Sequence, residues 1–329
     1  MVIHDFPWMV KEERSKKENS AIALIISFTP LYFNISLNML RKIKEFEYLN
    51  PSTLSKLISF LAEYKDQAKI FGGGTDVLIQ LKQRKLSPKY LIDIKKISEL
   101  DYIKYDEDEG LKIGALVTHT SLANSEVIRE KYSLLAEASL AVGVLQTRNR
   151  GTIVGNICNA SPSADTLPAL IALDASLKLV SFEGERIVKI EKFFTGPFKT
   201  ILKETEVVTE IQIPSLSHHS GGAYLWLPKI TSVDESIVGA AAVVTLKDLK
   251  NKICANARIS LGSVAPVPFR AKMAENFIKG KKLESMVCKE AAEIAANESS
   301  PRSRAEYRKE ITKVLVKRSL DKALKNVSK

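Results

Sequence analysis

The sequence predicts an α+β fold with more than one domain. Helix and strand patterns alternate up to about residue 213, and long strands and then helices follow them. These later patterns occupy residues 237–246 and 253–262 as strands, and 269–278, 283–296 and 303–325 as helices. A chain of 329 residues, 45% of them hydrophobic, can bury a sizeable core. We therefore expect two or three compact units, with a boundary in the polar, glycine-bearing stretch Pro214–Gly222.

The first elements follow from hydrophobic periodicity. Leu54, Leu57, Ile58 and Leu61 have helical spacing, and Ser52 or Thr53 is placed to cap that helix. Residues 68–71 are typical of a short buried strand, and residues 75–81 predict a second helix whose inner face carries Val77, Leu78 and Leu81. The further segments expected in this half are 90–94, 111–113, 133–142, 177–180 and 207–213.

Three consecutive glycines, Gly72–Gly74, separate the strand from the second helix. Glycine permits positive φ and removes every Cβ, so backbone N–H groups can approach an anion closely. A helix beginning at Thr75 adds unpaired N–H donors, which predicts a pyrophosphate site that needs no lysine. The alternative is a tight connection without a ligand. The turn matches neither G-x-G-x-x-G nor the P-loop pattern.

A second polar stretch lies at residues 151–165. Its hydrogen-bonding residues are Thr152, Asn156, Asn159, Ser161, Ser163 and Asp165, and Gly155 allows the chain to pass close to a ligand. The alternative is a surface loop in which Asp165 caps the helix expected at 167–173. Taken with the glycine turn, the density of polar groups favours a dinucleotide cofactor.

These stretches resemble one known family. The segments that carry the resemblance are residues 71–82, 146–157, 160–165 and 193–200, with Glu206 and residues 211–214. They are similar, in order, to the FAD-binding medium subunit of the molybdenum hydroxylases, the family of carbon monoxide dehydrogenase, xanthine dehydrogenase and aldehyde oxidoreductases. The resemblance runs from about Met39 to the C-terminus.

The resemblance implies a domain plan. Residues 39–214 would form a two-part FAD-binding domain of the vanillyl-alcohol-oxidase and molybdenum-hydroxylase type, with subdomains at 39–95 and 96–214. Residues 223–329 would form a C-terminal antiparallel sheet with a helical bundle. Residues 1–38 precede the family's usual start, so we expect Met39 to be the true start. The alternative is a genuine appendage that docks on a partner. The apolar run 21–40 has too many polar interruptions to predict a membrane span.

The resemblance also implies cofactor contacts. The residues expected to wrap the FAD pyrophosphate are Ile70, Phe71, Gly72, Gly73, Gly74, Thr75, Asp76 and Val77. A second cradle would comprise Thr152, Ile153, Val154, Gly155 and Asn156, with Asn159 and Asp165 contacting the flavin or its ribityl chain. Val208 would pack against the cofactor. Lys229 would lie near the isoalloxazine, or else be an ordinary solvated lysine. Val154 and Glu235 depart from the family, which usually has glycine and an aromatic residue there.

The implied function is electron transfer. FAD on this chain would pass electrons from 2Fe–2S clusters to an external acceptor. The molybdenum–pterin cofactor would lie on a large subunit and the clusters on a small one, in a heterotrimer or a dimer of heterotrimers. An aldehyde is one expected substrate, oxidised on the molybdenum subunit. No catalytic residue is predicted in this chain. The alternative is a self-sufficient FAD-dependent oxidase or dehydrogenase with its own substrate pocket.

Composition narrows the remaining classes. The three cysteines and four histidines show no ligand spacing, so we expect no metal site, and the sparse cysteines fit a reducing cytoplasm. The net charge is +11, but residues 302–329 alone hold ten basic and three acidic residues. We expect one basic terminal helix with a buried stripe of Ile311, Val314, Leu315, Leu320 and Leu324. No nucleic-acid-binding module accompanies it.

Overall fold

The computed structural model describes residues 43–229 and 235–327. Residues 46–77 and the described residues from 88 onward form one compact unit. Residues 78–87, with most of helix α3 (Val77–Lys82), belong to a different unit and are described by themselves. The predicted N-terminal extension, residues 1–38, and the proposed start at Met39 lie outside the described residues.

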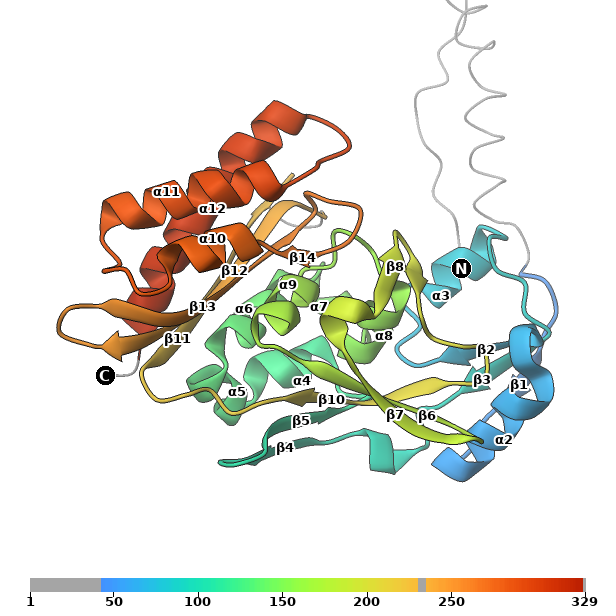
Figure 1. Ribbon diagram of the computed structural model, residues 1–329. Coiled ribbons are helices and arrows are strands. Elements are labelled where there is room, and N and C mark those ends of the chain that lie inside the picture. The colour runs from blue at the N-terminus through green and yellow to red at the C-terminus, as the bar shows by residue number, and fades with distance from the viewer. Residues whose placement is uncertain (1–42, 230–234, 328–329) are drawn as a thin grey trace, which may run out of the picture. The chain divides into compact units, whose positions relative to one another are not determined.

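A small parallel sheet opens the compact unit (Figure 1). Its strands are β1 (Glu47–Leu49), β2 (Ala68–Phe71) and β3 (Tyr90–Asp93), in the order β1-β3-β2. Helix α2 (Leu54–Tyr64) connects β1 to β2, and the Thr53 side chain caps it by accepting from Lys56 N. Leu57 and Leu61 are buried, as the periodicity predicts. Because the strands are parallel, the turns after β2 and β3 leave the sheet at the same edge.

An antiparallel sheet of five strands follows, in the order β4-β5-β10-β6-β7. Its strands are β4 (Ile103–Asp106), β5 (Gly110–Gly114), β10 (Val207–Ile213), β6 (Ser176–Ser181) and β7 (Gly184–Lys189). The chain between β5 and β6 forms α4 (His119–Asn124), α5 (Glu126–Lys131), α6 (Ser133–Ala141), α7 (Leu145–Arg148), α8 (Ile153–Asn159) and α9 (Thr166–Ala172). A hairpin of β8 (Phe194–Gly196) and β9 (Lys199–Thr200) precedes β10, and 3-10 turns cover Lys65–Gln67, Ser98–Leu100 and Ile190–Lys192.

The C-terminal part is an antiparallel sheet covered by helices on both faces. Its strands are β11 (Ser220–Pro228), β12 (Ser236–Asp248), β13 (Ile253–Gly262) and β14 (Phe269–Arg270), followed by helices α10 (Lys272–Ile278), α11 (Ser285–Glu298) and α12 (Ala305–Asn326). Successive side chains of a strand point to opposite faces. Tyr224, Ala241 and Val243 accordingly join the core of the preceding domain. Ala223, Ala240 and Ala242 pack instead with the C-terminal helices. The predicted α+β class, with a C-terminal antiparallel sheet and helices, is confirmed.

Several boundaries differ from the prediction. Helix α3 begins at Val77 rather than Thr75, and Leu78, expected on its inner face, is exposed. Gly221 and Gly222 belong to β11 rather than to a linker. Phe269 and Arg270 pair with β13 as β14, so the helix expected from residue 269 starts at Lys272. On α12, Leu315 and Leu320 are buried but Val314 is exposed.

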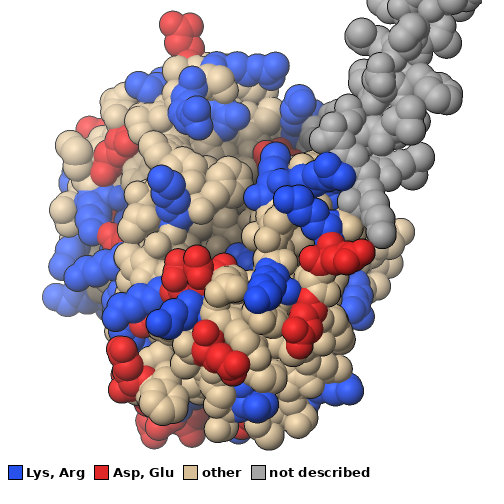
Figure 2. Space-filling view, turned by 90° about the vertical axis from the view of Figure 1, so that its right-hand side faces the viewer, with Lys and Arg blue, Asp and Glu red and all other residues tan. Residues whose placement is uncertain are grey.

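Some basic residues of the terminal helix form ion pairs with acidic residues of the same helix. On α12, Lys313 pairs with Glu310 at 2.6 Å and Lys317 with Asp321 at 2.8 Å. On the face shown in Figure 2, Lys and Arg side chains are interspersed with Asp and Glu side chains over much of the described surface. This distribution differs from the clustered basic stripe typical of a nucleic-acid-binding face. No helix in the described ranges is long and apolar enough to cross a membrane.

Gly221 lies close against the backbone at the end of α12. A Cβ there would lie 2.3 Å from both Ala323 O and Val327 N. We expect Gly221→Ala to push α12 off the sheet, because backbone atoms cannot rotate away. Overpacking of this kind costs about 1–3 kcal/mol, which for a chain of this size lowers Tm by roughly 2–10 °C in a thermal unfolding scan. Gly196→Ala is the control, since its Cβ would meet nothing within 4 Å. Equal melting temperatures for the two variants would contradict this packing.

Candidate functional site

The glycine turn leaves the carboxyl end of β2, and two of its glycines are sterically required. Gly74 has φ +79°, and a Cβ there would lie 2.5 Å from the Phe71 ring. A Cβ at Gly73 would lie 2.0 Å from the carbonyl oxygen of Arg150. Gly72 is less confined, because its nearest neighbour would be Thr152 Oγ1 at 3.6 Å. The turn therefore packs backbone against backbone on the second predicted stretch.

The second stretch is held in place by its own backbone hydrogen bonds. His119 N donates to Gly151 O at 3.1 Å, and Ile153 N donates to Val117 O at 3.1 Å. Thr118 and Thr152 form an isolated antiparallel bridge between these bonds. Asn159 Nδ2 adds a side-chain link across the two stretches by donating to Asp76 Oδ1 at 3.2 Å. The two predicted motifs thus form one continuous backbone surface.

Residues 153–159, which lie within the predicted polar stretch, form a helix, α8. Thr152 caps the helix, because its Oγ1 accepts from Gly155 N at 3.1 Å. Val154 is buried and Gly155 is exposed. The Val154 side chain, a departure from the family pattern, therefore points into the core. Asn156 Oδ1 accepts from Thr166 Oγ1 at 2.6 Å, which ties α8 to α9.

The Asp165 side chain is hydrogen-bonded to residues of the C-terminal sheet. Its side chain makes no N-cap hydrogen bond to α9, contrary to the loop alternative. Instead, Oδ1 accepts from Tyr224 OH at 2.7 Å and from the Ser236 hydroxyl. Burial raises the pKa of Asp165 to about 6, although the hydrogen bonds from Ser236 and Tyr224 lower it in part. The carboxyl is therefore a buried group that titrates within reach of neutral pH.

An ion pair missed by the sequence analysis lies beside the glycine turn. Lys95 Nζ is 2.6 Å from Asp93 Oδ2 and 3.4 Å from the carbonyl oxygen of Gly72. Tyr48 OH donates to the same carboxylate at 2.5 Å. The expectation that the pyrophosphate is held without a lysine stays a prediction, because the ammonium group is bonded to Asp93 and Gly72. The available signal was the position of Asp93 and Lys95 directly after a buried parallel strand, at the edge where ligands bind in α/β sheets.

A buried histidine lies behind the second stretch. His119 is 2% exposed, and its Nδ1 has no hydrogen-bond partner within the described residues. Burial, reinforced by the charge of Arg148, lowers the pKa of His119 to about 4, so the imidazole is neutral near pH 7. Over the described part of the chain, no group of three His, Cys, Asp or Glu side chains is arranged to hold a metal ion.

The remaining candidate residues lie in different surroundings. Ile70, Phe71 and Thr75 are partly buried around the turn, while Asp76 is exposed. Val208 is 1% exposed in β10, next to an irregularity in the β10–β6 register. Lys229 is exposed at the end of β11 and makes no hydrogen bond or ion pair to another described residue. The geometry therefore joins the first motif to the second but assigns no contact to Lys229.

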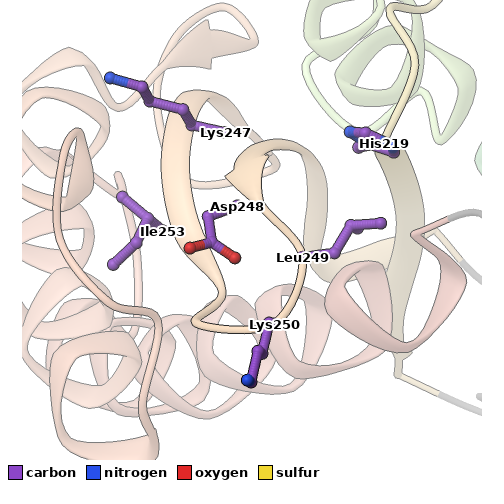
Figure 3. A pocket seen from close by; sticks show the side chains of 6 residues that line it. All are labelled: His219, Lys247, Asp248, Leu249, Lys250 and Ile253. Atoms are coloured by element: carbon purple, nitrogen blue, oxygen red, sulfur yellow. The ribbon is translucent and has the colours of Figure 1, made fainter.

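One hollow in the described surface lies elsewhere. It measures about 660 Å³, is open to solvent, and is lined by His219, Lys247, Asp248, Leu249, Lys250 and Ile253 (Figure 3). These residues come from the start of β11 and the β12–β13 turn. None belongs to either motif, so we do not assign the hollow to the candidate site.

Comparison with known proteins identifies the family. Residues 44–216 match the model described as "FAD binding domain in molybdopterin dehydrogenase", and residues 228–323 match "CO dehydrogenase flavoprotein C-terminal domain". The chain belongs to this flavoprotein family. The resemblance stated from the sequence motifs is thereby confirmed, and the domain that carries both motifs is the family's FAD-binding domain.

Several similar proteins align with most of the length of this flavoprotein. The glyceraldehyde dehydrogenase medium chain of Sulfolobus acidocaldarius is 34% identical, over 82% of this chain and 95% of the relative. The carbon monoxide dehydrogenase medium chain of Hydrogenophaga pseudoflava is 33% identical, over 84% of this chain and 96% of the relative. A structure of carbon monoxide dehydrogenase from the same organism aligns with TM-score 0.82 and 32% identity, over 88% of this chain and all of that chain. Quinoline 2-oxidoreductase from Pseudomonas putida aligns with TM-score 0.81 and 28% identity, over 88% and 100%.

The turn of the flavoprotein fits a phosphate-bearing cofactor. Where Gly73 and Gly74 lie, a Cβ would collide with neighbouring atoms, so the chain path requires a bare backbone. Bare backbone N–H groups are what a pyrophosphate needs for close approach. The helix that follows, α3, has six residues and begins two residues later than expected, so Thr75 and Asp76 belong to the turn.

Gly73→Ala tests the backbone contact in the flavoprotein. We expect a loss of FAD affinity of about 5- to 150-fold, because a clash of this size forces the two stretches apart and overpacking costs about 1–3 kcal/mol. Bound flavin per protein is measured by visible absorbance after gel filtration. Gly196→Ala is the control, since its Cβ would meet nothing within 4 Å. If Gly196→Ala loses as much flavin as Gly73→Ala, the clash with Arg150 is not the cause.

Asp165→Asn tests the buried carboxyl through pH. A folded-state pKa of about 6 exceeds the usual value of 3.8, so burial of the neutral acid is favourable at low pH and that advantage is lost as pH rises through 6. The unfolding free energy of the wild type, relative to Asp165→Asn, should fall by on the order of 3 kcal/mol between pH 4 and 7. Denaturant titrations at several pH values measure it. Asp101→Asn, at an exposed carboxylate, is the control. A difference independent of pH would contradict the buried, neutral-favouring environment.

Proposed function

We propose that this chain is the FAD-carrying electron-transfer subunit of a cytoplasmic molybdenum hydroxylase. The observation that carries the proposal is the junction of the two motifs into one backbone surface, through Gly73 and Arg150. That surface lies in a domain whose family binds FAD. FAD, when bound, accepts electrons from one partner and passes them to another, while the protein sets its position and access.

The chain's own residues would bind and orient the cofactor. Backbone N–H groups of residues 72–76 would hold the pyrophosphate, with Thr152–Asn156 as the second cradle. Asn159 would contact the flavin or its ribityl chain, with its amide oriented by the hydrogen bond that it donates to Asp76. Asp165 would contact the flavin or its ribityl chain from a fixed position, because Tyr224 and Ser236 donate hydrogen bonds to its Oδ1. Val208 would support the cofactor from within β10, and Lys229 would supply a cation near the isoalloxazine.

The names of similar proteins support the proposed partner subunits. Relatives are named as medium chains or FAD-binding subunits of carbon monoxide, xanthine and glyceraldehyde dehydrogenases. We infer a heterotrimer, or its dimer, with a molybdenum–pterin large subunit and a small subunit carrying 2Fe–2S clusters. The similarity to the glyceraldehyde dehydrogenase chain supports an aldehyde as the substrate, oxidised on the large subunit. The sparse, unpaired cysteines support the cytoplasm.

Purification of the complex under native conditions tests the proposal. We expect a flavin spectrum, with molybdenum and iron in the same sample, and reduction of the flavin when an aldehyde is added. As a control, the Gly73→Ala chain should assemble with the metals but bring little flavin. The relative proportions of the three polypeptides give the stoichiometry.

Two results would contradict the proposal. Flavin without molybdenum or iron, together with direct substrate turnover by this chain alone, would favour the self-sufficient flavoenzyme. A complex that remains colourless and takes up no added FAD would remove the FAD role altogether. Flavin reduction by a purine or by carbon monoxide, and not by aldehydes, would overturn only the substrate class.

A further inference from the structure

The Asp93 carboxylate beside the glycine turn is held by hydrogen bonds from Lys95 and Tyr48. Asp93 ends β3, and its side chain is 7% exposed. Its Oδ2 accepts from Lys95 Nζ at 2.6 Å and from Tyr48 OH at 2.5 Å, while Oδ1 accepts from Lys95 N at 3.0 Å. Burial alone would raise the pKa of Asp93, but the hydrogen bonds from Lys95 and Tyr48 outweigh it and lower the pKa. The carboxylate is therefore ionised at neutral pH and holds the Lys95 amine in place.

The held amine reaches two residues of the turn. Lys95 Nζ lies 4.1 Å from the centre of the Phe71 ring, a cation–π contact, and 3.4 Å from Gly72 O. The Phe71 ring in turn lies against Gly74, where a Cβ would approach it to 2.5 Å. The ammonium group thus acts on the start of the turn directly and on its end through the aromatic ring.

We propose that Lys95 is a positioning residue that sets the conformation of the glycine turn and so the affinity of the chain for FAD. The inference rests on the proposed function of this site. Its action goes through the turn rather than through charge on the cofactor, because Asp93 already neutralises the ammonium group at 2.6 Å. Removing Lys95 leaves Phe71 and Gly72 without the contact that orders them before the ligand arrives.

The neighbouring lysine provides a matched control. Lys96 is exposed and one residue away, and its side chain makes no hydrogen bond or ion pair with another described residue. Replacing Lys95 or Lys96 by Met removes the same charge from nearly the same place. A purely electrostatic contribution to binding would make the two variants alike. A contribution through the turn affects Lys95 alone.

FAD titration of the full chain, in its complex, measures the effect at low and high salt. We expect Lys95→Met to weaken binding roughly 5- to 30-fold, the range for losing one cation–π contact and one charge-assisted hydrogen bond. Lys96→Met should change binding less than about twofold. Lys95→Arg should restore most of the affinity, since guanidinium keeps both contacts. The salt dependence of binding should stay unchanged, because no contact with a phosphate is lost.

A double-mutant comparison separates positioning from loss of fold. In a Phe71→Leu background, Lys95→Met should have a smaller effect than in the wild type, because only the hydrogen bond to Gly72 O remains to be lost. Melting temperatures of all variants are measured alongside. A Lys95→Met chain that binds FAD as tightly as Lys96→Met overturns the proposal. So does a reduced salt dependence, which would mean direct contact with a cofactor phosphate. Failure of the wild type to bind FAD in any form would instead overturn the proposed function.

Discussion

The direct contact between two backbones, at Gly73 and Arg150, is the constraint on which the site depends. A single methyl group at Gly73 would lie 2.0 Å from the Arg150 carbonyl oxygen, so the two stretches can meet only with a bare backbone on one side. The other elements bring these two points together. The parallel pairing of β2 with β3 fixes where the turn leaves the sheet, and the Thr118–Thr152 bridge fixes the opposite stretch. Because protein interiors deform little, a shift in either support reaches the contact.

The second stretch is also supported from the C-terminal sheet. Tyr224 and Ser236 hold Asp165, and Ser263 N donates to Pro162 O at 2.8 Å. Gly262 lies so close to Pro168 that a Cβ would approach Cγ to 2.7 Å. Helix α12 contributes from further away, since Arg308 donates to the carbonyl oxygens of Ile237 and Ser263. The two family domains are therefore joined through the loop that carries the candidate cofactor residues, and the C-terminal domain takes part in shaping the site.

Local patterns in the sequence predicted what local forces decide. Strand β2 was predicted to the residue, and so was β13, because each carries several apolar side chains and is bounded by turn residues or charges. The family motifs located the two stretches that meet at Gly73 and Arg150. Helix α8 was missed because its seven residues include polar ones that equally suit a loop. The partners of Asp165 could not be predicted, because Tyr224 and Ser236 lie far along the chain from it. Such contacts exist only once the tertiary structure forms.

The hydrogen bonds from Tyr224 and Ser236 to Asp165 have a consequence for synthesis of the chain. Chains emerge from the ribosome N-terminus first, and domains tend to fold as they appear. The glycine turn leaves early, and its partner at Arg150 follows. The carboxyl of Asp165, however, stays without its two donors until Ser236 has emerged. These two hydrogen bonds therefore form only after most of the polypeptide has been synthesised, and the final placement of Asp165 depends on the C-terminal sheet.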